Sequence, residues 1–468
     1  MTGVKESASG RLARLLTSPQ NAFLLLASFF GVVMLFLTPP ALVGDEPNHF
    51  FRAYQISDGT IVGVKHEGYS GGWIPESVLV TNRRLVGDIE MHHDVKFDTN
   101  LITELRRVPL DEDNKVFVAF HNTVVYSPVA YVPQVIGIWA GKAVGASALG
   151  LIYFARFVNL LFFLALAYSA IRITPVHKWT FAFLWLTPTT VFQTASASVD
   201  AFTFGICFFG IACFLRLAFD DDVQVDWRTI AGLFAVCLLA VLSKQAYVLL
   251  PALFLIIPRA KFRSPGIYYL IFILLIFSCI AAVVWWSATV KPIFMSYRGD
   301  IETDPDRQLE LILDAPLDFL KIAVASYLKL YKYYFVTFFG QLTWLDLFVP
   351  KWVTVYLFAI VTGFAVLDKG VNTRISTFDK SIFTAVIAGT ALVVSVLLYL
   401  SWSPVGADRV AGIQGRYFIP VAPLFFLLLF NQKLRWGFFE RRVALIFYVT
   451  VTISLAVTVY TVTRRYYL

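Results

Sequence analysis

The residues best suited to chemistry lie directly after the first apolar stretch, in the segment Gly44–Phe50. Asp45 and Glu46 are adjacent carboxylates, and His49 and Arg52 follow them closely. Charged groups placed where hydrocarbon meets water are costly and usually have a function. A carboxylate in such a place can take a proton from a hydroxyl group, so this segment is the first candidate for an active site.

A second group of polar residues lies at the ends of later apolar stretches. It consists of one carboxylate, three cations and a tyrosine: Asp200, Lys244, Arg409, Arg416 and Tyr417. Carboxylates that face two or three cations suit group transfer from an anionic leaving group, because Lys or Arg stabilises the charge that develops on a phosphate. The elements that carry these residues must therefore bring them to one side of the protein.

Each residue also has a simpler interpretation. Asp45 and Asp200 could cap helices, since Asp is a favoured N-cap and Pro47 fits a first turn. Lys244 could extend to lipid headgroups, and Arg416 could anchor a helix at the membrane interface. Their presence on one face is what favours a functional role for all four.

Metal binding is a further option at the first segment. Asp45, Glu46 and His49 supply hard oxygen ligands and one imidazole, which suit a divalent ion. The pair His92–His93 is a poorer candidate. The sequence contains no glycine loop of the Walker or dinucleotide type and no Gly-x-Ser-x-Gly elbow, so it does not favour nucleotide chemistry or a serine hydrolase.

Composition identifies a polytopic membrane protein. Of the 468 residues, 58% are hydrophobic and 15% are charged, whereas soluble domains carry about 25% charged residues. The net charge of +8 comes mostly from short basic clusters between apolar runs, so nucleic acid binding is not expected. All four cysteines lie in apolar runs, which excludes a disulfide framework and a cysteine zinc site: Cys207, Cys213, Cys237 and Cys279.

The apolar runs predict an all-α bundle of about eleven transmembrane helices in one domain, residues 1–468. The runs lie near 20–38, 151–171, 180–197, 201–218, 229–243, 246–258, 267–287, 351–367, 381–400, 417–430 and 443–462. Several are shorter than about 20 residues, and the 229–258 pair could be a hairpin. Lys5, Arg11 and Arg14 precede Asn21–Leu37, which we interpret as a retained signal-anchor helix.

The connectors between the runs set the expected orientation. With the N-terminus inside, five connectors are cytoplasmic and four of these are basic: Arg172–Lys178, Asp220–Arg228, Arg259–Arg263, Asp368–Lys380 and Asn431–Arg442. The outer face then receives two long segments and three short ones: 39–150, 288–350, Ser198–Asp200, Lys244 and 401–416. The candidate site residues all fall on this face.

Two apolar segments within the outer loops, Tyr126–Ala143 and Phe319–Phe339, need a separate interpretation. If both crossed the membrane, the basic connector Arg259–Arg263 would lie outside, against the charge rule. We therefore expect both to be helices that lie in the membrane interface. The alternative is that either one spans the membrane.

Three strings resemble the signature of a bacterial membrane family called domain of unknown function 2142. They are Gly44–Gly59, Phe338–Asp346 and Gln414–Pro423, and the resemblance covers nearly the whole chain. That family in turn resembles the GT-C superfamily of membrane glycosyltransferases, which use polyprenyl-phosphate-linked sugars on the outer face of the membrane. The resemblance implies a GT-C-like bundle whose large first extracytoplasmic loop opens with an acidic pair and contains interfacial helices.

The resemblance also implies roles for individual residues. Asp45 would be the catalytic base, with Glu46 and Asp200 in support, and Lys244 and Arg416 would contact the phosphate. The other expected substrate contacts are His49, Arg52, Arg409 and Tyr417. Three further segments carry the likeness: Tyr126–Tyr131, similar to the proline-bearing interfacial helix, Ala155–Asn159, similar to the Arg motif of the second span, and Thr187–Asp200, similar to the second acidic site.

The expected function is transfer of a sugar from a polyprenyl-phosphate donor to a hydroxyl of a surface glycan or lipid-linked precursor, with inversion at the anomeric carbon. Donor, acceptor and membrane lipids are the expected partners. The expected location is the bacterial cytoplasmic membrane, with the site facing outward. The alternative is a transporter or flippase of lipid-linked glycans, which would place its essential charges at mid-membrane rather than on one surface.

Overall fold

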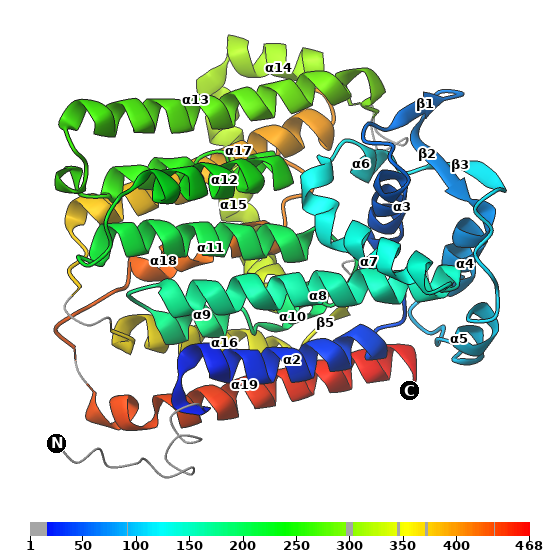
Figure 1. Cartoon of the computed structure of the whole chain (residues 1–468), viewed down its shortest axis with the longest axis horizontal. Helices are drawn as coiled ribbons and strands as arrows, with labels where there is room; N and C mark the ends of the chain where they lie inside the picture. The colour runs from blue at the N-terminus through cyan, green and yellow to red at the C-terminus, as the bar shows by residue number, and fades with distance from the viewer. Residues whose placement is uncertain (1–15, 91, 296–302, 344–346, 370–372, 435) are drawn as a thin grey trace.

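The computed structural model of the chain describes residues 16–90, 92–295, 303–343, 347–369, 373–434 and 436–468. Within them the protein is mostly helical, and six helices are long and apolar enough to cross a membrane. These are α2 (Pro19–Leu37), α8 (Ala148–Ile173), α11 (Asp200–Phe219), α13 (Pro265–Val290), α17 (Thr377–Ser401) and α19 (Gly437–Tyr466), which run along one direction in Figure 1. The fold is that of a multi-pass membrane protein. Lys5, Arg11 and Arg14 lie outside the described residues.

The described residues do not reach the expected count of about eleven spanning helices, because several apolar runs fold as shorter pieces. α12 (Trp227–Ser243) and α16 (Lys351–Leu367) have 17 residues each. The run near 180–197 forms two helices, α9 (Lys178–Leu184) and α10 (Pro188–Thr194), and not the single helix that we expected. Proline has no N–H to donate, so the chain breaks before Pro188 and a new helix starts there.

Two other runs are not regular α-helices either. The run near 246–258 contains the 3-10 helices η2 (Gln245–Tyr247) and η3 (Leu250–Ile256). The run near 417–430 consists of η6 (Gly415–Val421) and α18 (Ala422–Leu427). A 3-10 helix rises about 2.0 Å per residue against about 1.5 Å for an α-helix, so about twelve residues can return along the bundle, where η3 packs against α11, α13 and α17. The expected alternative of a hairpin over 229–258 agrees with this path.

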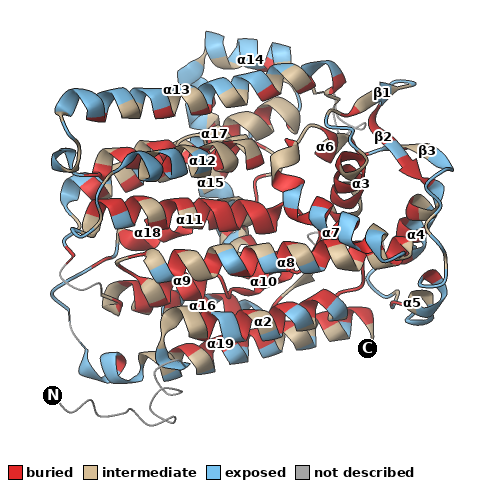
Figure 2. Ribbon diagram, viewed as in Figure 1, coloured by how far each residue is buried: buried red, intermediate tan, exposed pale blue. Residues whose placement is uncertain are grey.

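The core of the bundle forms around α8, which packs against α2, α11 and the loop helix α7 (Val132–Ala143). Figure 2 shows that α11 is mostly buried, whereas α13 is mostly exposed. The exposed face of α13 is apolar and includes Ile273, Phe277 and Trp285. An apolar face of this size on an outer helix is typical of contact with lipid, because water would make it costly.

The first long loop, 39–150, contains a small sheet as well as helices, so the expectation of a purely α-helical chain needs correction. The strands β1 (Val64–His66), β2 (Tyr69–Pro75) and β3 (Lys115–Ala119) pair antiparallel in the order β1-β2-β3. Gly71 allows β2 and β3 to approach, because a Cβ there would lie 1.8 Å from the Val118 carbonyl oxygen. The helical parts are α3 (Glu46–Ser57), α4 (Glu76–Val86), α5 (Asn100–Leu105), α6 (His121–Val124), η1 (Pro128–Tyr131) and α7.

The second long segment, 288–350, carries the other expected interfacial helix. It contains η5 (Lys291–Ile293), α14 (Pro305–Asp314), α15 (Pro316–Phe339) and the short strands β4 (Gln341–Leu342) and β5 (Leu347–Phe348). α15 is not among the helices that qualify as membrane spans. In Figure 1 it runs across the direction of the long helices, and its expected place in the membrane interface stays a prediction.

The five connectors that we expected to share one membrane face do gather at one end of the bundle (Figure 1). Lys261 donates to the Asp220 carbonyl, Lys369 to the Gln432 carbonyl at 3.1 Å, and Lys380 to the Leu428 carbonyl at 2.8 Å. The first long loop and the candidate site residues lie at the opposite end. The identification of these ends as inside and outside stays a prediction.

Candidate functional site

Asp45 occupies a bend between α2 and α3, and its side chain faces Asn122 and Arg416. Its backbone is left-handed, with φ of 63°, a conformation that costs a non-glycine residue about 1–3 kcal/mol. The side chain caps no backbone N–H of α3. Instead, one carboxylate oxygen accepts a 2.9 Å hydrogen bond from the amide of Asn122, which is itself bonded to Asn48. The interpretation of Asp45 as a helix cap is therefore wrong.

Asp200 is held at the start of α11 by a loop of small polar residues. The hydroxyl of Ser196 accepts from the Ser198 N–H, and the hydroxyl of Ser198 accepts from the Asp200 N–H at 3.2 Å. The Asp200 side chain caps no helix either; it accepts a hydrogen bond from Lys244 Nζ at 2.5 Å. Lys244 directly follows α12, is 16% exposed and is bonded to Asp200, so it faces a carboxylate and not lipid headgroups.

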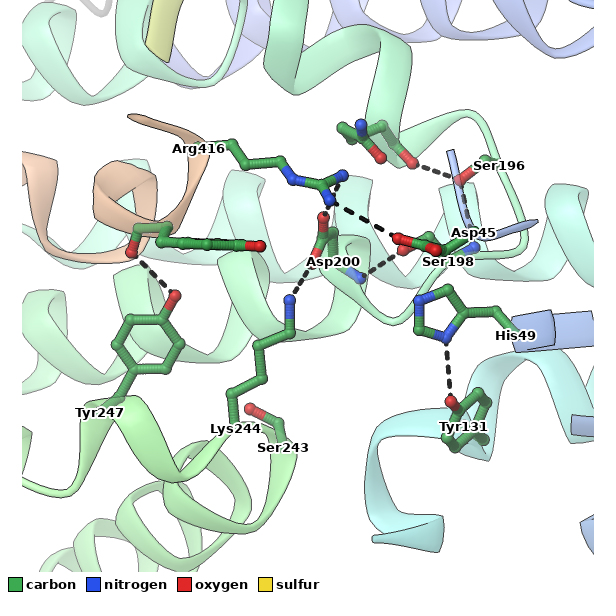
Figure 3. Close-up of polar contacts among 12 residues, drawn as sticks. Asp45, His49, Tyr131, Ser196, Ser198, Asp200, Ser243, Lys244, Tyr247 and Arg416 are labelled. Atoms are coloured by element: carbon green, nitrogen blue, oxygen red, sulfur yellow. Dashed lines mark hydrogen bonds and ion pairs between the residues drawn. The ribbon is translucent and has the colours of Figure 1, made fainter. Parts of the chain in front are cut away.

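Arg416 joins the two carboxylates (Figure 3). One of its terminal nitrogens lies 3.7 Å from Asp45 Oδ2 and the other lies 3.7 Å from Asp200 Oδ2. Gly415 lets the chain before Arg416 pack closely against α15, because a Cβ at 415 would lie 1.9 Å from the Tyr334 carbonyl oxygen of α15. We call Asp45, Asp200, Lys244 and Arg416 the charge cluster; its two carboxylates and two cations balance in charge.

The two carboxylates of the charge cluster differ in access. The Asp45 side chain is 33% exposed and the Asp200 side chain is 5% exposed. Partial burial raises the pKa of Asp45 above its usual value of 3.8, and the nearby positive charge of Arg416 opposes that rise. Asp45 is therefore both the more accessible carboxylate and a stronger base than a solvated aspartate.

His49 and Tyr417 line the charge cluster. His49 comes one turn after Asp45, is 6% exposed and contacts Tyr131 and Tyr126 from the segment that leads into α7. Burial lowers the pKa of His49 to about 3, so its ring is neutral at physiological pH. The Tyr417 ring lies 5.8 Å from Lys244 Nζ and 5.7 Å from the Arg416 guanidinium, which places an aromatic face beside both cations.

Glu46 has a different environment from its neighbour Asp45. It is fully buried and receives two hydrogen bonds from Arg156 of α8, Nε to Oε1 at 2.6 Å and Nη2 to Oε2 at 2.5 Å. It also accepts a 2.9 Å bond from the Ala197 N–H. Glu46 thus ties α3, α8 and the loop before Asp200 together, and its carboxylate does not join the charge cluster.

A second residue of α8 holds the same loop. Asn159, one turn after Arg156, donates to the carbonyls of Ser196 and Ser198 at 2.8 Å each. Gln134 of α7 donates to the Ser198 carbonyl at 3.0 Å. The motif Ala155–Asn159 and the loop helix α7 therefore position Asp200 from two sides.

Two of the residues expected to bind substrate, Arg52 and Arg409, lie outside the charge cluster. Arg52 is fully buried and donates to Gln55 at 2.6 Å, to the Ile61 carbonyl at 2.6 Å and to the Tyr126 carbonyl at 3.2 Å. It therefore holds the loop together. Arg409 is exposed in the segment before η6 and is not part of the charge cluster.

The expected metal ligands do not converge on one point. Glu46 is turned toward Arg156 and does not reach the charge cluster, and His49 is bonded to Tyr131 through Nδ1, so the trio does not present three ligands to one point. Across the described residues, no group of three or more His, Cys, Asp or Glu side chains is arranged to hold a metal ion. The donor set therefore does not fit a resident divalent ion, and we derive no step through one.

Sequence reasoning missed Asn122 and the role of Tyr131. Asn122 follows Asp45 by 77 positions, and Tyr131 follows His49 by 82. Asn122 has no motif around it that distinguishes it from other loop amides. The sequence signal is that Tyr131 lies within the apolar segment Tyr126–Ala143 and Asn122 lies four residues before it.

The fold and the site together define a multi-pass membrane protein with a charge cluster at one end of its helical bundle. The chain belongs to the family of predicted membrane proteins called domain of unknown function 2142 (DUF2142), whose family model matches residues 26–425. The match includes all three signature strings and every residue of the charge cluster. Neither the curated proteins nor the solved structures contain a match to this chain.

Proposed function

We propose that the protein is a GT-C-type glycosyltransferase that takes a sugar from a polyprenyl-phosphate donor and places it on a hydroxyl of a surface glycan or lipid-linked precursor. The observation that carries the proposal is the accessible carboxylate of Asp45 opposite Arg416. A base and an anion-binding cation are the two groups that such a transfer needs. The site would face outward from a bacterial cytoplasmic membrane.

The reaction is a single displacement at the anomeric carbon. Asp45 accepts the hydroxyl proton of the acceptor while the acceptor oxygen forms its bond to that carbon. The bond from the carbon to the phosphate oxygen breaks, and its electron pair leaves with the polyprenyl phosphate. The configuration at the anomeric carbon inverts because the two oxygens lie on opposite sides.

Arg416 is the cation best placed to receive the phosphate. Its two 3.7 Å contacts are longer than hydrogen bonds, whereas Lys244 is bonded to Asp200 at 2.5 Å. A phosphodiester oxygen can therefore bind Arg416 without breaking a short ion pair. Lys244 and Asp200 then serve to hold the guanidinium and to keep the local charge near zero before the donor binds.

Asp45→Asn tests the base assignment, since asparagine keeps the shape of the side chain and cannot take the proton. We expect sugar transfer to fall by about 10²–10⁴-fold with the protein still folded. The measurement is transfer from a panel of polyprenyl-phosphate sugars to glycans isolated from a deletion strain, together with mass analysis of the glycans of that strain. Full transfer by a folded Asp45→Asn protein would contradict the assignment.

Glu104→Gln is the matched control. Glu104 lies in the same loop, is 55% exposed and pairs with Arg84 at the surface. Its replacement should leave transfer unchanged, since exposed ion pairs contribute about 0–1 kcal/mol.

A vesicle experiment separates the enzyme from the alternative of a flippase. Donor and acceptor are offered only on the face of the vesicle to which the charge cluster opens. An enzyme forms product there without moving lipid across the bilayer. Movement of the donor without product would favour the flippase.

A further inference from the structure

His49 presents its two ring nitrogens to different surroundings. Nδ1 lies 2.9 Å from the Tyr131 hydroxyl, and the ring stacks on Tyr126 with centroids 5.9 Å apart. The other side of the ring, with Nε2, faces the charge cluster (Figure 3). Nε2 has no hydrogen-bond partner within the described part of the chain. The fold therefore holds one nitrogen firmly and leaves the other directed at the site.

The Tyr131 contact determines which nitrogen carries the proton. Tyr131 is fully buried, and His49 is the one hydrogen-bond partner of its hydroxyl among the described residues. Burial raises the pKa of Tyr131 well above its ordinary value of 10.0, so the hydroxyl keeps its proton. A buried hydroxyl that does not donate is destabilised, so Tyr131 donates to Nδ1. The neutral ring then carries its own proton on Nε2.

This N–H is on the side of the ring that points toward the charge cluster and the Asp45 carboxylate (Figure 3). His49 follows Asp45 by one helical turn, and its backbone N–H donates to the Asp45 carbonyl at 3.0 Å. An acceptor hydroxyl bound there has one proton and two lone pairs on its oxygen. The proton can go to Asp45, one lone pair can accept from His49, and the other lone pair stays free to attack the anomeric carbon.

We propose that His49 positions the acceptor: its neutral Nε2–H donates to the oxygen of the hydroxyl that Asp45 deprotonates, and Tyr131 fixes the tautomer that makes this donation available. The ligand is the hydroxyl-bearing acceptor and not the phosphate of the donor. No proton leaves His49 during the reaction. The inference rests on the proposed function, because it assigns the acceptor side of that site.

The first test reads the tautomer directly and needs no activity. The full chain, labelled with ¹⁵N-histidine in lipid nanodiscs, contains six histidines, and the signal that disappears in His49→Gln belongs to His49. We expect a neutral ring with the proton on Nε2 at pH 7, and a mixture of tautomers in Tyr131→Phe. A proton on Nδ1, or a charged ring, would overturn the inference.

The second test separates the acceptor side from the donor side. His49→Phe should lower kcat/KM for the acceptor by about tenfold, the effect of one lost hydrogen bond, and should leave hydrolysis of the donor by water unchanged. His49→Gln should recover part of the loss, because its amide can donate. Equal losses of transfer and hydrolysis, or full transfer by His49→Phe, would overturn the role.

His121→Phe is the matched control. His121 lies in the same loop and accepts a 3.2 Å bond from the Ser70 N–H, away from the charge cluster. Its replacement should change neither kinetic quantity. If no glycosyl transfer occurs at all while the His49 tautomer is as expected, the proposed function fails and the positioning of the ring stands. If transfer occurs and the tautomer differs, the proposed function stands and the role assigned to His49 fails.

Discussion

Asp45 and Glu46 are adjacent in the chain, yet they belong to two different kinds of ion pair. Glu46 and Arg156 are both fully buried and share two short hydrogen bonds. Asp45 and Arg416 are 33% and 11% exposed, and their closest atoms lie 3.7 Å apart. We call Glu46–Arg156 the sealed pair, because it has no room for a ligand. We call Asp45–Arg416 the open pair, because its carboxylate is accessible and no short hydrogen bond joins it to the cation. Adjacent residues in the sequence therefore need not share a role. Here the local packing gives Glu46 a structural role and leaves Asp45 accessible for chemistry.

The largest expected effect comes from breaking the sealed pair. Glu46→Gln leaves the Arg156 guanidinium buried without its carboxylate, and the loss of one partner of a buried ion pair costs about 3–5 kcal/mol of stability. We expect a large fall in the thermal unfolding temperature in detergent. The double variant Glu46→Leu with Arg156→Met should recover much of it, because no buried charge remains. An unchanged unfolding temperature for Glu46→Gln would contradict the comparison.

Loss of the open pair should lower the activity. Arg416→Gln removes the cation expected to bind the phosphate, and a hydrogen bond to a charged group contributes about 1.5–3 kcal/mol, or about 10–150-fold in kcat/KM for the donor. Asp45 would also lose the positive charge that lowers its pKa, so the acid limb of the rate profile should move to higher pH. An acid limb that does not move would mean that Arg416 does not act on Asp45.

Asn122→Ala should also lower the rate and raise the pKa of Asp45, with a smaller effect than Arg416→Gln. It removes the 2.9 Å hydrogen bond to Asp45, which contributes about 0.5–1.5 kcal/mol, or about 2–12-fold in rate. That bond favours the ionised carboxylate, so its loss should again raise the pKa of Asp45 and move the acid limb upward. The control is Asn114→Ala, which removes a surface bond to Glu76 and should leave the pH profile as it was.

The smallest effect should be that of Asp45→Asn on stability, with a sign opposite to that of Glu46→Gln. The pKa of Asp45 is raised in the folded protein, so its contribution to stability is present below pH 3.8 and is lost as the pH rises through the folded value. At neutral pH the ionised carboxylate is therefore mildly unfavourable, and asparagine also tolerates the left-handed backbone. We expect an unfolding temperature equal to or slightly above that of the wild type at pH 7, with the difference shrinking toward pH 4. A fall as large as that of Glu46→Gln would place Asp45 among the structural residues.

Several parts of the site could be predicted from the sequence because they depend on topology alone. The apolar runs and basic connectors placed Asp45, Asp200, Lys244 and Arg416 at one end of the bundle, and the structure brings these four into contact. The expectation for the run near 180–197 failed because hydropathy does not register the break at Pro188. The pairing of β2 with β3 was missed because its partners are 40 to 48 positions apart along the loop.

The separation of Asp45 from Glu46 could not be predicted in the same way. Both are carboxylates next to a helix start, and either could have faced Arg416. The left-handed turn at Asp45 and the position of Arg156 on α8 direct their side chains apart. Both features depend on how α3 packs against α8 and the loop before Asp200.

The sequence by itself determined the class of the protein, its family, the end of the bundle that carries the charges and the four residues of the charge cluster. These follow from hydropathy, connector charge and local strings, which are properties of neighbouring residues. Only the tertiary structure decided which carboxylate is sealed and which is open, and that Asn122 and Tyr131 orient Asp45 and His49. Such choices arise from contacts between residues more than seventy positions apart, and packing of the folded chain is what brings them together.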